Sequence, residues 1–326
     1  LGVLISLINM NLHSVFATFE IGTNNFNEIK KLTKILNPHQ VIITNIYPTH
    51  LKNFKNLKNI AYEKGDLFNP KYNSNLQLLI LKNSNTDDKY LINLAKKNMT
   101  KNLVTWGSKK NSDFHLKNIK LINQKSSVTS INHKKELIKI KTSTNIEHQI
   151  INLLITFILF KFNTLNTNIF FNKIIKPPLV DGRGKIHRIK IKSKVINFID
   201  ESYNASPVSM LNAIKYYNDY PLKKNQKKFL ILGEMLELGV KKNLYHKLIV
   251  DEVAKTNINF IFFSGKYYKK ILNRKNLLLH KNIYHMSTEN IMKNINYKIH
   301  NDDIILIKSS NATKLNKLAK KLINKE

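Results

Sequence analysis

Residues 194–233 read KVINFIDESYNASPVSMLNAIKYYNDYPLKKNQKKFLILG and contain a complete strand–helix–strand unit. The runs KVINFID (194–200) and KKFLILG (227–233) are mostly apolar, as expected for strands covered on both faces of a parallel sheet. Ser206 precedes Pro207, and a capping side chain followed by proline in the first turn is typical of a helix start. The stretch therefore predicts a helix crossing between two parallel strands, which is the repeating unit of α/β domains.

The same alternation continues from this unit to the C-terminal end of the sequence. It predicts strands at INFIFFSG (258–265) and DIILIKSS (303–310), with helices near Leu244, after Lys266 and after Asn311. Upstream, the pair Pro177–Pro178 cannot lie inside a helix or a central strand, and Gly182 and Gly184 allow tight turns. We therefore expect a hinge in this stretch and a smaller, Rossmann-like α/β domain over residues 181–326.

The N-terminal half shows a related pattern. Apolar runs predict strands at residues 15–21, 41–46, 76–82 and 103–107, and amphipathic stretches predict helices after Asn27 and around residues 60–68. This βαβα rhythm indicates a doubly wound, mostly parallel sheet. Residues 108–145 alternate less regularly and indicate a small antiparallel excursion, followed by a helix over residues 148–161. The expected fold class is α/β, with a central domain over residues 1–180.

Basic side chains dominate the composition. The 54 Lys and Arg residues against 21 Asp and Glu give a formal net charge of +33, a balance typical of proteins that bind nucleic acid or an anionic membrane surface. Only Arg183, Arg188 and Arg274 are arginines, however, although the planar guanidinium is the group that grips phosphate bidentately. Lysines scattered among asparagines and isoleucines fit drift toward A/T-rich codons better, so no specific nucleic-acid partner is expected.

The sequence also limits the compartment. It contains no cysteine, which excludes disulfides and thiolate metal sites and is compatible with a reducing cytoplasm. The longest apolar run, IINLLITFILF at residues 150–160, has about half the length that a membrane-spanning helix needs. The first residues lack the charged-then-apolar pattern of a signal peptide. We therefore expect a cytoplasmic protein without membrane insertion.

Several short strings lie at the ends of the predicted strands and at the starts of the helices. They are FEIGTNNFNEI (19–29), TNIYPTHL (44–51), AYEKGDLF (61–68), EHQIIN (147–152), GRG (182–184), DESYNASPVSM (200–210), LGEMLELG (232–239) and IKSSNA (307–312). In this order and spacing they resemble the Mur ligase family, and DESYNASP and LGEMLELG resemble its D-alanyl-D-alanine-adding branch. Most of the nine glycines, scarce in this composition, lie in these strings.

The resemblance implies an ATP-dependent carboxylate–amine ligase with Mg²⁺ as the metal cofactor. Its substrates would be UDP-N-acetylmuramoyl-tripeptide and D-alanyl-D-alanine, joined through an acyl phosphate in peptidoglycan synthesis. In such a reaction ATP phosphorylates the terminal carboxylate of the tripeptide, and the amine of the dipeptide attacks the acyl phosphate. Cations and metal ions lower the barrier because they neutralise phosphoryl charge and align the reacting groups.

The resemblance further implies a set of metal ligands. Glu20 would bind magnesium, His50 would bind a second metal ion, and Lys64 resembles the lysine that relatives carbamylate into an anionic oxygen ligand and that belongs to their catalytic set. Each residue also has an ordinary interpretation. Glu20 fits a solvated or helix-capping carboxylate, His50 fits a loop histidine, and Lys64 fits one unmodified lysine among many.

Other matched positions are implied to bind the nucleotide and to promote catalysis. These are Asn152 beside the adenine, Arg183 at the γ-phosphate, and Asp200, Glu201, Tyr203 and Asn204 around the cleft, with Lys308 as a catalytic lysine. As surface residues, Asn152 and Arg183 would be unremarkable. Glu201 stands where the family has Asp, so its extra methylene puts the ribose contact in doubt. Ser309 follows Lys308 where the family has Gly, which can hinder a close backbone approach.

Two parts of the family plan are not found in the sequence. No G-x-x-G-K-[ST] phosphate loop occurs, and no N-terminal UDP-binding domain is recognisable. The sequence leaves open a truncated form of a full enzyme, one half of a split enzyme completed by a separate N-terminal half in trans, and an eroded relic. The alternatives are a non-catalytic scaffold of ligase descent, a sister Mur ligase or folylpolyglutamate-type ligase, and a basic nucleic-acid-binding protein.

Overall fold

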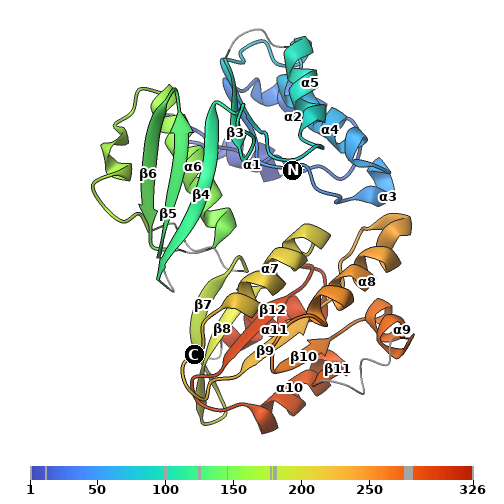
Figure 1. The fold of residues 1–326 in the computed structure, drawn as a ribbon. Coiled ribbons are helices and arrows are strands. Elements are labelled where there is room, and N and C mark those ends of the chain that lie inside the picture. The colour runs from blue at the N-terminus through green and yellow to red at the C-terminus, as the bar shows by residue number, and fades with distance from the viewer. Residues whose placement is uncertain are drawn as a thin grey trace. The chain divides into compact units, whose positions relative to one another are not determined.

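The computed structural model describes residues 2–11, 13–98, 102–123, 126–144, 146–176, 178, 182–274 and 282–324. By its internal contacts the chain divides into two compact units, Leu1–Ile119 with Thr129–Lys139 and Lys120–Val128 with Ile140–Glu326. Its strands form two mostly parallel sheets of six strands each, both drawn in Figure 1. This arrangement confirms the predicted α/β class.

The first sheet has the strand order β1-β2-β3-β4-β5-β6. Its strands are β1 (Gln40–Ile43), β2 (Leu78–Lys82), β3 (Leu103–Gly107), β4 (Phe114–Asn123), β5 (Ser126–His133) and β6 (Glu136–Thr142). Strands β1 to β4 pair in parallel. Lys134 and Lys135, the two residues between β5 and β6, have φ angles of 46° and 71°, as in the tight turn of an antiparallel hairpin. Three predicted strands and the antiparallel excursion are therefore confirmed.

The described helices of this half include the three that the sequence predicted and three that it did not. They are α1 (Gly2–Ile8), α2 (Glu28–Leu36), α3 (Leu51–Phe54), α4 (Leu57–Gly65), α5 (Lys89–Asn98) and α6 (Glu147–Phe162), with the 3₁₀ turns η1 (Asp66–Phe68) and η2 (Thr167–Phe170). The predictions after Asn27, around residues 60–68 and over 148–161 correspond to α2, to α4 with η1, and to α6. Trp106, the only tryptophan in the sequence, lies in β3 and is 1% exposed.

The strand predicted at residues 15–21 is wrong. These residues form neither a helix nor a strand, and Val15 is 87% and Phe16 61% exposed. Their apolar composition suits a strand, but a strand also requires a neighbour whose backbone groups pair with its own. The first sheet ends at β1, and within the described residues nothing pairs with residues 15–21. The apolar composition of residues 15–21 therefore predicted one strand too many for the first sheet.

The second sheet has the order β11-β10-β9-β12-β8-β7. Its strands are β7 (Lys185–Ile191), β8 (Lys194–Glu201), β9 (Lys228–Leu232), β10 (Phe260–Phe263), β11 (Ile283–His285) and β12 (Ile304–Lys308). All pairs are parallel except β7 with β8. The four strands predicted from residue 194 onward are confirmed, whereas β7 and β11 were not predicted.

Two apolar layers cover the faces of the second sheet. Its helices are α7 (Pro207–Asp219), α8 (Lys242–Val253), α9 (Lys266–Arg274), α10 (Thr288–Lys298) and α11 (Lys314–Ile323), with the 3₁₀ turn η3 (Gly239–Lys241). Residues of α7, α8 and α9 pack on one face, whereas residues of α10 and α11 pack on the other (Figure 1). Neighbouring residues of β12 show the alternation, since Leu306 joins the first layer and Ile305 the second. A parallel sheet that is buried on both faces by helices is the arrangement expected of a Rossmann-like domain.

Helix α7 begins where the sequence predicted. Ser206 caps it by accepting a hydrogen bond from the backbone N–H of Ser209, and Pro207 is the first helical residue. We expect Ser206→Ala to lower the free energy of unfolding by about 1 kcal/mol, because a helix N-cap loses its acceptor. Urea denaturation of both proteins measures the change. Ser206→Thr, which keeps the hydroxyl, should retain most of the stability, and equal losses in both variants would contradict a capping role.

None of the described helices is both long and apolar enough to cross a lipid bilayer. The longest described helix, α6, has 16 residues.

Candidate functional site

The polar residues of the second sheet gather at its carboxyl edge, where open α/β sheets place their ligand sites. Strands β8 and β12 are parallel neighbours, and Glu201 and Lys308 are paired in register at their ends. The strings DESYNASP and IKSSNA therefore meet because the strand register brings their ends together. The sequence predicted both strings as site residues without predicting this pairing.

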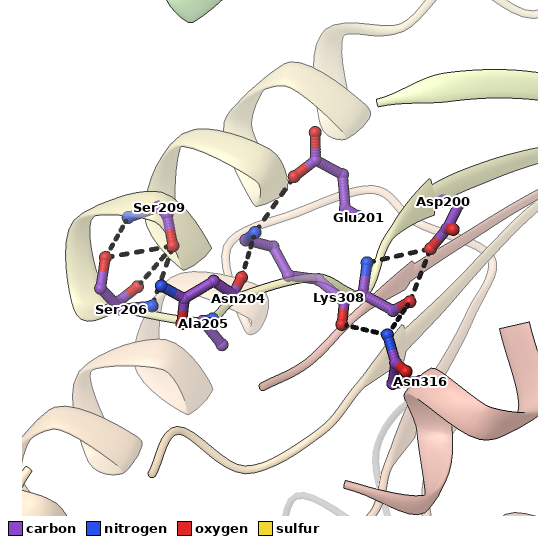
Figure 2. Close-up of polar contacts among 9 residues, drawn as sticks. Asp200, Glu201, Asn204, Ala205, Ser206, Ser209, Lys308 and Asn316 are labelled. Carbon is purple, nitrogen blue, oxygen red and sulfur yellow. Dashed lines mark hydrogen bonds and ion pairs between the residues drawn. The ribbon is translucent and has the colours of Figure 1, made fainter. Parts of the chain in front are cut away.

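Lys308 and Glu201 form an ion pair (Figure 2). The Lys308 Nζ lies 3.1 Å from the Glu201 Oε2, and the two side chains are 3% and 18% exposed. The same amine donates to the backbone oxygen of Asn204 at 3.0 Å. A buried ammonium needs such acceptors, because leaving water without them costs several kcal/mol. The amine of Lys308 is thus held in one place at the strand end.

The Asp200 side chain is buried and hydrogen-bonds to Ser202, two residues further along the chain. It is 3% exposed, and its Oδ1 accepts hydrogen bonds from the backbone N–H and the hydroxyl of Ser202 at 3.0 and 2.7 Å. The amide of Asn316, on α11, donates to the backbone oxygen of Ser202 at 2.9 Å (Figure 2). Asp200 and Asn316 therefore shape the loop after β8.

A glycine turn brings Arg183 to Tyr203. Gly182 and Gly184 have φ angles of 75° and 85°, in the left-handed region that favours glycine. The Gly184 N–H donates to the Asp200 oxygen at 2.8 Å, and a Cβ on Gly184 would lie 2.9 Å from the Glu201 Oε1. The Arg183 guanidinium lies 4.7 Å from the centre of the Tyr203 ring, within the range of a cation–π contact. Both side chains are exposed.

Two residues of α6, Asn152 and His148, are also among or next to the predicted site residues. Asn152 is exposed, and its backbone oxygen accepts a hydrogen bond from the Thr156 hydroxyl. Burial lowers the pKa of His148, while the charge of Glu201 raises it and those of Lys308 and Arg183 lower it. His148 is thus electrostatically coupled to the ion pair, a coupling that the string EHQIIN did not predict. The amide of Asn152 is available to a ligand.

In the N-terminal half, two amines meet at Asn45, which follows β1. The Lys64 Nζ donates to the backbone oxygen of Asn45 at 3.2 Å, and the Lys82 Nζ donates to its side-chain oxygen at 2.6 Å. Lys64 lies in the last turn of α4, and Lys82 ends β2. The contact places the predicted catalytic lysine beside the string TNIYPTHL.

Burial lowers the pKa of Lys64. A lysine whose folded-state pKa lies below its unfolded value binds fewer protons in the folded state, so the free energy of unfolding rises with pH between the two values. We expect Lys64→Met to remove this dependence. The wild type should gain stability relative to the variant as the pH rises toward 10.5, the ordinary lysine value.

Denaturation of both proteins between neutral and alkaline pH measures that difference. Lys71→Met, at an exposed lysine, is the matched control and should give a difference that changes little with pH. A difference between wild type and Lys64→Met that is constant across this range would contradict the burial argument.

Glu63, next to Lys64, is a residue that the sequence interpretation missed. It is 3% exposed, and its carboxylate accepts the backbone N–H groups of Asn27 and Ile29 at 2.8 and 2.9 Å and the Thr23 hydroxyl at 3.3 Å. A carboxylate at a helix start satisfies N–H groups that have no partner inside the helix. Glu63 thus fixes the start of α2. The only signal was its position within AYEKGDLF.

Glu20 and His50 are placed differently from the expectation. Glu20 is exposed and does not end a buried strand, because residues 15–21 form no strand. His50 precedes α3 with a φ angle of 53°, and its backbone oxygen accepts the N–H of Phe54. Across the described residues, no three His, Asp or Glu side chains are gathered so that they could hold a metal ion. The metal-binding role of Glu20, His50 and Lys64 stays a prediction.

Glu234, in the loop at residues 233–239, is a second residue that the sequence interpretation missed. The Glu234 carboxylate accepts the backbone N–H of Tyr267 at 2.8 Å, at the start of α9. The Gly233 N–H donates to the Lys308 oxygen at 2.9 Å, and the Leu236 N–H donates to the Ser310 hydroxyl at 3.2 Å. The string LGEMLELG thus forms a loop bonded to the end of β12.

Comparison with known proteins places both halves of the chain in one family. The model of the Mur ligase middle domain matches residues 1–160, and that of the "Mur ligase, glutamate ligase domain" matches residues 187–311. The chain is 29% identical over 325 residues to the UDP-N-acetylmuramoyl-tripeptide–D-alanyl-D-alanine ligase of Buchnera aphidicola subsp. Baizongia pistaciae, covering 99% of this chain and 67% of that protein. It is 28% identical to the Rickettsia prowazekii ligase of the same name, covering 98% and 68%.

Solved structures share the fold. MurF from Acinetobacter baumannii gives a TM-score of 0.79 at 20% identity, covering 99% of this chain and 68% of that one. The MurF ligase from Thermotoga maritima in complex with ADP gives 0.70 at 20% identity, covering 93% and 66%. The chain thus spans about two thirds of the length of these relatives.

Proposed function

Because the chain belongs to the Mur ligase family, we propose that it forms the central and C-terminal parts of an ATP-dependent ligase that adds D-alanyl-D-alanine to UDP-N-acetylmuramoyl-tripeptide. The relatives that match nearly the whole chain carry this name. The site observation that carries the proposal is the group at the carboxyl edge of the second sheet, where Lys308, Glu201 and the Arg183 turn meet. These residues come from strings far apart in the sequence.

The proposed reaction has two balanced steps. The tripeptide carboxylate takes the γ-phosphoryl group of ATP and gives an acyl phosphate and ADP. The amine of D-alanyl-D-alanine then attacks the acyl carbon, forming the amide and releasing phosphate and a proton. Negative charge spreads over the transferred phosphoryl group, so cations held in fixed positions around it lower the barrier. Mg²⁺, when bound, would supply part of the positive charge that neutralises this group.

The chain's own cations suit this chemistry. Arg183 is exposed, and its stacking on Tyr203 holds a planar guanidinium ready for a bidentate contact with phosphate oxygens. Lys308 is held by Glu201 at the strand end. We propose that Lys308 acts from within this ion pair and that Glu201 positions the lysine in place of contacting ribose. Asn152, with an exposed side chain, is the proposed contact to the adenine.

Three further parts of the proposal concern the organisation of the enzyme. We propose a domain boundary between residues 180 and 181, supported by the two family models, which match residues 1–160 and 187–311. Phosphate binding would need a loop that residues 1–326 do not contain, so we propose that a polypeptide carrying such a loop, either joined to this chain or separate from it, takes part in the reaction. The proposed place of reaction is the cytoplasm, where soluble precursor and ATP are available.

Phosphate release tests the function. The chain is incubated with UDP-N-acetylmuramoyl-tripeptide, D-alanyl-D-alanine, ATP and Mg²⁺, with and without the N-terminal third of the Buchnera relative. We expect release that requires both substrates and the added polypeptide. Release with a single amino acid in place of D-alanyl-D-alanine would support a sister ligase. Absence of release in every combination would overturn the proposal and leave a relic of ligase descent.

A further inference from the structure

The structure assigns to His246 a role in positioning the loop at residues 233–239 against the end of β12. His246 lies on α8 and is 0% exposed. Its Nε2 accepts the backbone N–H of Met235 at 3.1 Å, and its Nδ1 lies 2.7 Å from the backbone oxygen of Lys242. The consequence for catalysis rests on the proposed function, because the segment reached through the loop contains Lys308.

Only one form of the His246 ring satisfies both contacts. A backbone oxygen can only accept, so Nδ1 must carry the hydrogen, and a backbone N–H can only donate, so Nε2 must present its lone pair. The ring is therefore neutral with its proton on Nδ1. Protonation would place an N–H of the imidazolium against the N–H of Met235, and that hydrogen bond would be lost.

The loop transmits the position of Met235 to the end of β12. On one side of Met235, the Gly233 N–H donates to the Lys308 oxygen. On the other side, the Leu236 N–H donates to the Ser310 hydroxyl. A chain held by hydrogen bonds at three nearby residues has little freedom, so losing the central one loosens the contacts on both sides. His246 thereby influences the backbone that carries Lys308 without touching a substrate.

The surroundings of the ring favour its neutral form. The ring packs against Tyr268 with centres 4.8 Å apart and against Tyr267 at 5.2 Å. Burial lowers the pKa of His246, while the Lys242 oxygen and the charge of Glu234 raise it. The described ionisable groups that face the ring also include the phenols of Tyr267 and Tyr268, and the Lys242 amine lies over the Tyr267 ring. The geometry and the enclosure point to the same protonation state.

Two substitutions separate hydrogen bonding from packing. His246→Gln places an amide oxygen near the former Nε2 position and can still accept the Met235 N–H, whereas His246→Asn reaches only toward the Lys242 oxygen. In the phosphate-release assay with the N-terminal third added, we expect kcat to fall about tenfold in His246→Asn and much less in His246→Gln. Below neutral pH, the wild type should lose activity as the ring protonates, but His246→Gln should not show this step.

A readout independent of turnover keeps this inference apart from the proposed function. ¹⁵N NMR of the uniformly ¹⁵N-labelled chain should show a neutral His246 ring with its proton on Nδ1 at pH 7. As the ring protonates, the amide signals of Met235 and Leu236 should shift together with it. A charged ring or an Nε2–H tautomer at pH 7, amide signals unmoved by protonation, or equal effects of the two substitutions would overturn the assignment. Loss of turnover with the NMR signature intact would instead count against the ligase proposal.

Discussion

Lys308→Met is expected to lower the free energy of unfolding by about 2 to 3 kcal/mol, because it leaves the Glu201 carboxylate mostly buried without its cation. The amine of Lys308 lies 3.1 Å from Glu201, and the lysine is 3% exposed. The value lies below that of a fully enclosed pair because Glu201 is 18% exposed and water still reaches it. Urea denaturation followed by far-UV circular dichroism measures the change.

A second variant distinguishes the ion pair from the packing of the lysine stem. Adding Glu201→Gln to Lys308→Met removes the uncompensated charge, so stability should recover in large part while the proposed ligase activity stays lost. Lys314→Met is the matched control. Its amine lies 3.8 Å from Glu289, and both side chains are more than half exposed, so we expect no measurable change in stability, as is common for exposed ion pairs. Equal losses for Lys308→Met and Lys314→Met would refute the buried-pair argument.

Gly233→Ala should be about as damaging, with an expected loss of about 2 to 3 kcal/mol. A Cβ at this position would lie 2.6 Å from the Ser309 Cβ and 2.9 Å from the Leu315 Cδ1. The Ser309 Cβ is fixed to the backbone of the segment after β12 and cannot move aside as a flexible tip can. The added methyl would push apart the same loop and strand end that the Gly233–Lys308 hydrogen bond joins.

Two controls give this prediction a sharp test in the same denaturation experiment. Gly65→Ala adds a methyl in α4 near the tip of Leu94, at 3.2 Å, and should change stability little because alanine also favours the helix. Combining Gly233→Ala with Ser309→Gly removes the clashing Cβ and should restore part of the loss. Among the described residues the Ser309 hydroxyl is buried without a hydrogen-bond partner, so its removal leaves no acceptor unpaired. A double variant no better than Gly233→Ala would contradict the steric account.

The sequence predicted the second sheet better than the first. Strands such as KKFLILG are covered on both faces and read as unbroken apolar runs, and the Ser206–Pro207 pair marks the start of α7. Residues 15–21 have a similar composition but form no strand, because pairing depends on a neighbour that local sequence does not specify. Strand β7 was missed because polar and apolar residues alternate along it, as on a sheet edge.

For the candidate site, the strings identified the neighbourhood but not the contacts. That Glu201 meets Lys308 follows from the register of β8 and β12, which no local pattern encodes. The sequence did not predict that Asp200 bonds to Ser202, and its role at the nucleotide stays a prediction. The sequence did not predict the roles of Glu63 and His246, and the reason is the same for both. A single carboxylate or imidazole in an amphipathic helix looks the same in sequence whether it faces water or satisfies buried backbone groups.

The burial of Trp106 in β3 determines which part of the chain tryptophan fluorescence reports on during the denaturation experiments. As the chain's sole tryptophan, it would dominate the intrinsic fluorescence, and its emission would report only on the first sheet. A variant that loosens the second sheet could therefore unfold there while the emission signal stays native. Recording fluorescence and circular dichroism on one sample would reveal whether the two sheets melt together or in succession.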